Sequence, residues 1–144
     1  MYEQVGSIPE PRKMAEFASL LSPLPSEQGY CTTDRQRTQE IYEPLLCHAL
    51  PHGLWKMAML AIVWPHGSIY PHADGDNEYD GCRRYHIVLQ NNQLCWHLHD
   101  GKWQKLKEGG IYVMNPLKEH AAINWGGDPR IHLVVDVKET GELQ

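Results

Sequence analysis

The sequence predicts a mainly β fold, an antiparallel sandwich or barrel with N-terminal helices packed on one of its sheets. From residue 54 onward, apolar and polar residues alternate with the period of two that is typical of strands. Short turn sequences rich in Gly, Asn and Asp separate the alternating stretches, as they do in antiparallel sheets. The first fifty residues show apolar residues at helical spacing instead.

Two helices are expected before the strands. The first covers residues 10–21, where apolar residues recur every three or four positions. The second begins after Thr33, with Gln36 as its capping-box partner, and ends near residues 51–53. Pro44 lies inside the second helix and is expected to kink or restart it, because proline cannot donate the backbone hydrogen bond of a helix interior.

Seven strands are expected after the helices. They cover residues 55–64, 68–74, 83–90, 93–99, 111–115, 120–125 and 130–137. Residues 75–81, between the second and third strand, are rich in Gly and Asp and are expected to form a mobile loop.

Length and composition limit the class of protein. The 144 residues are expected to form one domain, with residues 1–53 as helical support and residues 54–138 as the β core. A formal net charge of −5 argues against nucleic acid as a partner. No apolar run is long enough to span a membrane and no signal-peptide pattern is visible, so we expect a cytoplasmic location. The four cysteines are widely spaced and are expected to be free thiols.

Three residues are candidate metal ligands: His72, Asp74 and His120. Side chains two apart on a strand share a face, so His72 and Asp74 point the same way, as two ligands from one strand must. Two histidines and one carboxylate can form the facial triad that binds Fe(II) and leaves adjacent coordination positions open. Zinc accepts the same ligands, so a zinc hydrolase is an alternative, although it gives the arginines described next no role.

Other polar residues suit 2-oxoglutarate as a cosubstrate. Arg130 follows His120 by ten residues and could bind the distal carboxylate of 2-oxoglutarate through two hydrogen bonds. Arg84 and His86 could donate to the cosubstrate carboxylates, although His86 could equally be a core histidine. Asn124 could orient a ligand or the cosubstrate.

Two further alternatives concern the same strands. Arg130 could pair with Asp128 or Asp136 at a strand end instead of binding a cosubstrate. His97 and His99 share a strand face and could form a rival metal site. Because they adjoin an Asp-Gly hairpin turn, we interpret them as a solvated strand end.

The alternation also predicts where the site lies. On the strands at residues 83–90 and 130–137, charged residues and histidines occupy one face and aliphatic residues the other. This asymmetry predicts a barrel with a polar, functional interior and an apolar outside that packs under the helices.

Four segments resemble the aspartyl/asparaginyl β-hydroxylase family, which also includes bacterial proline hydroxylases. They are WPHGSIYPHAD (64–74), RRYHIVLQ (83–90), EGGIYVMN (108–115) and HAAINWGGDPRIHLVVD (120–136). The resemblance implies a double-stranded β-helix of the jelly-roll or cupin kind and Fe(II)/2-oxoglutarate chemistry.

The resemblance also assigns roles by position. It implies that His72, Asp74 and His120 are the iron ligands and that Arg130 binds the distal carboxylate of 2-oxoglutarate. Arg84 and His86 match the further pair that contacts the cosubstrate in the family. Some members that act on protein aspartates and asparagines carry glycine at the position of Asp74, so the carboxylate here favours the amino-acid hydroxylases.

The expected function is therefore that of an Fe(II)- and 2-oxoglutarate-dependent dioxygenase. Such a hydroxylase would act on an amino acid, free or as a residue in a peptide or protein, with O2 as oxidant and succinate and CO2 as coproducts. The alternative is a non-catalytic, cupin-like module that binds a metal or small ligand.

Overall fold

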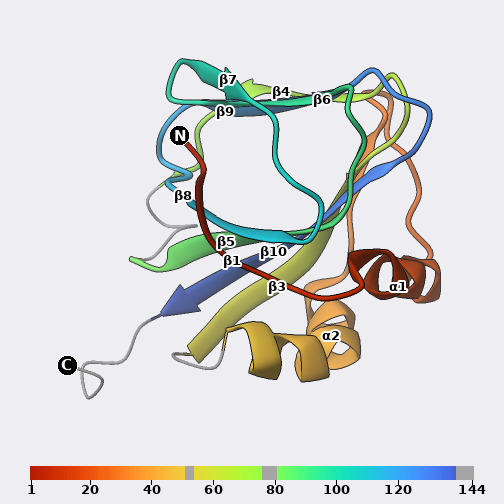
Figure 1. Cartoon of the computed structure of the whole chain (residues 1–144), viewed down its shortest axis with the longest axis vertical. Helices are drawn as coiled ribbons and strands as arrows, with labels where there is room; N and C mark the ends of the chain where they lie inside the picture. Colours follow the sequence, from red (N-terminus) through yellow and green to blue (C-terminus); the bar gives the residue numbers. More distant parts are fainter. Residues whose placement is uncertain (51–53, 76–80, 139–144) are drawn as a thin grey trace.

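The computed structural model describes residues 1–50, 54–75 and 81–138, and these contain ten strands in two sheets that face each other (Figure 1). In chain order the strands are Glu3–Ser7 (β1), Tyr30–Thr32 (β2), Leu54–Val63 (β3), Ser68–His72 (β4), Arg83–Gln90 (β5), Cys95–His99 (β6), Lys102–Gln104 (β7), Gly110–Met114 (β8), His120–Asn124 (β9) and Arg130–Lys138 (β10). The large sheet has the order β1-β8-β5-β10-β3-β2 and the small sheet the order β4-β9-β6-β7. All neighbouring strands are antiparallel.

The path of the chain confirms the predicted double-stranded β-helix. From β3 to β10 the chain passes back and forth between the sheets, and only β6 and β7 follow each other within one sheet. Each crossing turns the chain around the space between the sheets, so residues far apart in sequence face the same interior.

The helices cover the outer face of the large sheet, as predicted (Figure 1). The α-helix Pro11–Ala15 (α1) continues into the 3₁₀-helix Glu16–Leu21 (η1), and the α-helix Arg35–Ala49 (α2) lies beneath the sheet. Thr38, Tyr42 and Leu46 of α2 are spaced by four residues and are buried, so this stripe of α2 is its contact face. The Tyr42 hydroxyl donates to the Met14 carbonyl oxygen at 2.8 Å, which ties the two helical segments together.

The two faces of the large sheet differ as the alternation predicted. Ile87, Leu89, Leu133 and Val135 belong to the apolar core under the helices. The alternate positions on β5 and β10 face the interior between the sheets and carry charged residues and histidines, all of them buried: Arg84, His86, Arg130, His132 and Asp136. The apolar core therefore lies outside the barrel and the polar site inside it.

Several expectations for the elements were wrong. The first fifty residues are not only helical, because β1 and β2 add a strand to each edge of the large sheet. The strand β7 was also missed. These strands have three to five residues, none of them buried, so burial imposes little alternation on their sequence.

The start of α2 also differs from the prediction. Asp34 is the N-cap, and its carboxylate accepts from the Arg37 backbone N–H at 2.8 Å. The Thr33 hydroxyl instead accepts from the Leu60 backbone N–H at 2.9 Å, which fastens the helix start to β3. The helix continues through Pro44 to Ala49. The predicted loop at residues 75–81 lies mostly outside the described residues. No helix in the described ranges is both long and apolar enough to cross a membrane.

Substitution of Leu133 by alanine tests the packing of the outer face. Leu133 is fully buried on the central strand β10, so Leu133→Ala should lower the free energy of unfolding by about 2–5 kcal/mol. Leu54→Ala, at the exposed start of the paired strand β3, is the matched control and should change it by less than about 0.5 kcal/mol. Urea unfolding followed by circular dichroism measures both; equal effects would contradict this placement of the core.

Candidate active site

His72 and His120 lie opposite each other on neighbouring strands of the small sheet. The register of β4 and β9 pairs their Cα atoms, and the centroids of their rings are 4.2 Å apart. Asp74 follows just past the end of β4, where its backbone N–H donates to the Pro116 carbonyl oxygen at 2.9 Å. This bond ties the segment of Asp74 to the loop that precedes β9.

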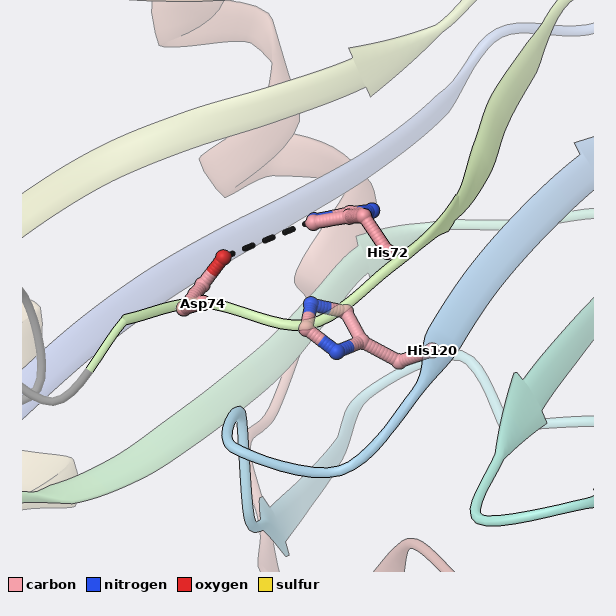
Figure 2. A group of neighbouring side chains, drawn as sticks. All are labelled: His72, Asp74 and His120. Atoms are coloured by element: carbon pink, nitrogen blue, oxygen red, sulfur yellow. Dashed lines mark ion pairs between the residues drawn. The ribbon is translucent and has the colours of Figure 1, made fainter.

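The side chains of these three residues converge on one point (Figure 2). One ring nitrogen from each histidine and one carboxylate oxygen of Asp74 all lie within 4.8 Å of one another. The His72 Nε2 atom is 3.5 Å from Asp74 Oδ1. The structure therefore brings together the two histidines and the carboxylate that the sequence singled out.

Hydrogen bonds decide which ring nitrogen each histidine presents. His72 Nδ1 lies 2.8 Å from the Tyr70 carbonyl oxygen, and His120 Nδ1 lies 2.8 Å from the Lys118 carbonyl oxygen. A carbonyl oxygen can only accept, so each Nδ1 carries the hydrogen and each Nε2 keeps a lone pair. Burial also lowers the pKa of His120, which favours its neutral form. Two neutral imidazoles and a carboxylate fit a divalent metal such as Fe(II).

Arg84 joins the carboxylate of the triad to a second carboxylate on β10. Its Nε and Nη2 atoms donate to the two oxygens of Asp136 at 2.7 and 2.9 Å, and its Nη1 donates to Asp74. Burial lowers the pKa of Arg84, but the hydrogen bonds and charges of Asp136 and Asp74 outweigh it, so the net pKa is raised. Arg84 thus orients Asp74, in the manner of the outer residues that orient metal ligands.

Arg130 is a buried cation whose hydrogen-bond partners are all neutral. Its side chain is on β10, with 2% of the residue exposed. Its Nε donates to His97 Nε2 at 3.2 Å, its Nη2 to His132 Nδ1 at 2.8 Å and its Nη1 to the Ala61 carbonyl oxygen at 3.3 Å. A guanidinium has five N–H bonds, so two remain for a ligand.

No carboxylate of a described residue forms an ion pair with Arg130. Asp136 pairs with Arg84, and Asp128 lies 3.8 Å from the exposed Arg12. The alternative that Arg130 pairs with Asp128 or Asp136 is therefore wrong. Burial lowers the pKa of Arg130 to about 10, which still leaves it charged at neutral pH.

Neutral imidazoles surround this charge. Burial, together with the positive charge of Arg130, lowers the pKa values of His86, His97 and His132 well below the ordinary value of 6.5. Because Arg130 must donate, His132 Nδ1 must accept. His86 Nδ1, 2.9 Å from the same atom, is then the donor of the second bond.

Two predictions for histidines are corrected by this arrangement. His86 lines the cavity, but its one N–H is used on His132, so the neutral ring has none to donate to a cosubstrate carboxylate. His97 and His99 are buried, not a solvated strand end. The alternation on β6, which places His97 and His99 on one face with Cys95, was the signal for their burial; the adjoining turn obscured it.

A cavity of about 250 Å³ lies between the sheets and connects the two halves of the site. His72, Asp74 and His120 line it from the small sheet and the segment after β4, and Arg130 lines it from the large sheet. Tyr2 of the N-terminal segment also lines it, a residue that no pattern in the sequence singled out. The cavity thus brings the three candidate metal ligands and a buried cation within reach of one small molecule.

Comparison with known proteins assigns the family. The model of the family described as aspartyl/asparaginyl β-hydroxylase matches residues 29–140. The chain belongs to this family. L-proline cis-4-hydroxylase from Rhizobium meliloti (strain 1021) is 29% identical over 72 residues, which are 50% of this chain and 26% of that protein. The match thus spans about a quarter of the length of this relative.

Solved structures support the fold. The non-heme alpha-ketoglutarate-dependent epimerase SnoN from nogalamycin biosynthesis has a TM-score of 0.70 at 14% identity, over 96% of this chain and 77% of that one. A Pseudomonas putida prolyl-4-hydroxylase has a TM-score of 0.60 at 13% identity, over 97% and 93% of the two chains. Both are similar to this β-hydroxylase family member in fold.

Asn124 has a different role from the predicted one in this family member. It is fully buried, and its Nδ2 donates to the carbonyl oxygens of Val63 at 2.9 Å and Asp128 at 2.8 Å. Its Oδ1 accepts from the Gly126 backbone N–H at 2.9 Å. Asn124 does not line the cavity that holds the triad, and it instead fastens the turn between β9 and β10.

The neutral histidines predict how stability depends on pH. Their pKa values are lower in the folded protein than in the unfolded chain, so the unfolded chain binds more protons below about pH 6.5. Stability should hold above this pH and fall as pH decreases, by up to about 1.4 kcal/mol per pH unit for each histidine. Urea unfolding between pH 7.5 and 5.5 measures the slope.

Two variants separate the buried histidines from the rest of the chain. His97→Gln keeps an acceptor for Arg130 and should make the slope shallower. His48→Gln, at an exposed position on α2, should leave it unchanged. The same slope in both variants would show that the fall in stability has another origin.

Proposed function

We propose that this protein is an Fe(II)- and 2-oxoglutarate-dependent dioxygenase that hydroxylates an amino acid, free or as a residue in a peptide or protein. One observation carries the proposal: Arg130, a buried cation without a carboxylate partner among the described residues, lines the same small cavity as the triad. A site of this kind suits a molecule with a carboxylate at one end and a metal-chelating group at the other.

The electrostatics of Arg130 favour an anionic ligand. A buried charge is costly unless it is paired, and the neutral histidines satisfy the hydrogen bonds of Arg130 without neutralising it. A carboxylate supplies the missing charge and matches the fork of a guanidinium. In 2-oxoglutarate the distal carboxylate would take this place.

The triad would hold Fe(II) at the other end of the cavity. His72 and His120 present Nε2 lone pairs toward Asp74, and the hydrogen bond from Arg84 orients the carboxylate. When bound there, Fe(II) and 2-oxoglutarate supply the oxidation: O2, 2-oxoglutarate and a C–H bond become succinate, CO2 and a C–OH group. The protein's contributions are to position the reactants and exclude water.

The relatives support an amino-acid substrate. The curated relative is a proline hydroxylase, and a prolyl-4-hydroxylase and an alpha-ketoglutarate-dependent epimerase share the fold. The carboxylate ligand Asp74, which some family members replace by glycine, is present here. We therefore favour hydroxylation of a free amino acid or of a residue in a peptide.

Anaerobic titration of the Fe(II)-loaded protein with 2-oxoglutarate tests the cosubstrate. A weak visible charge-transfer band should appear as 2-oxoglutarate chelates the metal. Arg130→Ala should raise the concentration needed by about 100-fold or more, because the distal carboxylate then lacks its cation. Arg12→Ala, a control at an exposed arginine on α1, should titrate like the wild type. If Arg130→Ala needs the same concentration of 2-oxoglutarate as the wild type, 2-oxoglutarate does not bind to Arg130.

Loss of the carboxylate ligand tests the metal site. Asp74→Ala should weaken Fe(II) binding and abolish the release of succinate, since one of three ligands is lost. Asp128→Ala, at an exposed aspartate in the β9–β10 turn, should bind metal as the wild type does. Turnover close to wild type in Asp74→Ala would exclude Asp74 from the triad. Binding of metal and 2-oxoglutarate by the wild type without any succinate would favour the non-catalytic module.

A further inference from the structure

Tyr2 is a buried tyrosine whose hydroxyl has no hydrogen-bond partner in the part of the chain that the structure describes. The residue is 4% exposed and lines the cavity between the sheets. No side chain or backbone group of residues 1–50, 54–75 or 81–138 forms a hydrogen bond with its hydroxyl. The hydroxyl is not one of the fully enclosed unpartnered atoms of the described residues, so it is accessible from the cavity and can donate to a ligand there.

The surroundings of Tyr2 hold its ring in place. Its backbone N–H donates to Gln104 Oε1 at 2.8 Å, and Gln104 Nε2 donates back to its carbonyl oxygen at 3.2 Å. Gln104 belongs to β7 of the small sheet, whereas Tyr2 leads into β1 of the large sheet. The rings of His86, His97 and His99 lie with their centroids 5.3, 5.9 and 5.5 Å from that of Tyr2. The hydroxyl is therefore fixed before any ligand arrives.

The hydroxyl lies beside the buried cation. Burial raises the pKa of Tyr2 to about 12, and the positive charges of Arg130 and Arg84 act against this rise. The hydroxyl thus keeps its proton at neutral pH and can donate it in a hydrogen bond. His86 also lines the cavity near Arg130, but its N–H is already used on His132. Tyr30 lines the cavity and interacts with the charge of Arg130 as well, but it is less buried than Tyr2.

We infer that the Tyr2 hydroxyl donates a hydrogen bond to the carboxylate that Arg130 binds, which makes Tyr2 a cosubstrate-binding residue. This inference rests on the proposed function, in which that carboxylate is the distal one of 2-oxoglutarate. Tyr2 lies outside residues 29–140, the stretch that matches the family model. The N-terminal segment thus completes a site whose other residues lie within that stretch.

Tyr2→Phe tests the inference, because it removes the hydroxyl and keeps the ring. Calorimetric titration of the Fe(II)-loaded protein with 2-oxoglutarate, without O2, measures the affinity directly. The affinity should fall by roughly 10- to 100-fold, the loss expected for one hydrogen bond to a charged group. The urea midpoint without ligand should stay unchanged, because the hydroxyl has no hydrogen-bond partner among the described residues.

Tyr112→Phe is the matched control. Tyr112 is 5% exposed and shares an apolar cluster with Tyr2, but its hydroxyl accepts from the Lys107 backbone N–H at 2.8 Å, and Tyr112 is not among the residues that line the cavity. It should lower the urea midpoint and leave the affinity for 2-oxoglutarate as in the wild type.

The outcomes separate the inference from the function on which it rests. If the wild type binds 2-oxoglutarate and Tyr2→Phe binds it equally well, the inference is wrong and the proposed function stands. Equal weakening in Tyr2→Phe and Tyr112→Phe would assign the effect to packing and also overturn the inference. If the metal-loaded wild type does not bind 2-oxoglutarate, the proposed function fails and the inference fails with it.

Discussion

The buried positive charge of Arg130 organises the interior of this protein. Arg130 lies between the two sheets, and the residues that touch it are neutral acceptors. Around such a charge the histidines must stay unprotonated, and the carboxylate of Asp136 must be held by another arginine. Had Asp136 paired with Arg130, its carboxylate would neutralise the charge that Arg130 can present to an anionic ligand. In the proposed function, this charge, which no carboxylate of the described residues pairs, is what lets the cavity bind the carboxylate of a ligand.

The two sheets divide the site between them. The small sheet places His72 and His120 opposite each other through the register of β4 and β9, and backbone carbonyls fix their tautomers. The large sheet supplies Arg84 and Arg130 from its inner face, while its outer face packs on the helices. Because the apolar core lies outside the barrel, the interior does not have to supply it and can remain polar. This separation explains how a short chain accommodates a buried charged site.

The features that could be predicted from the sequence are those that depend on the alternation of polar and apolar residues or on the spacing of site residues. The long strands and the polar inner face follow from residues that are buried on one side, and the convergence of His72, Asp74 and His120 follows from their spacing on neighbouring strands. Short edge strands were missed, because β1, β2 and β7 bury too little to show a period. The hydrogen-bond partners of individual side chains could not be predicted either, because they depend on the register in which the strands pair.

Asn124 and His86 illustrate this limit. Both share a face with predicted site residues. Asn124 nevertheless holds a turn in place, and His86 donates its N–H in a hydrogen bond to His132. Tyr2 lines the cavity although the sequence did not single it out. The strand that follows it, β1, shows no alternation, and the position of Tyr2 depends on the pairing of β1 with β8.

The central claim is that the triad and Arg130 bind opposite ends of one molecule, and reciprocal affinities test it most directly. The affinity for 2-oxoglutarate should be measured anaerobically with and without Fe(II), and that for Fe(II) with and without 2-oxoglutarate. The account predicts that each ligand tightens the other by the same factor, of about ten-fold or more, because one molecule bridges the two halves of the site. Affinities that do not depend on each other would contradict it.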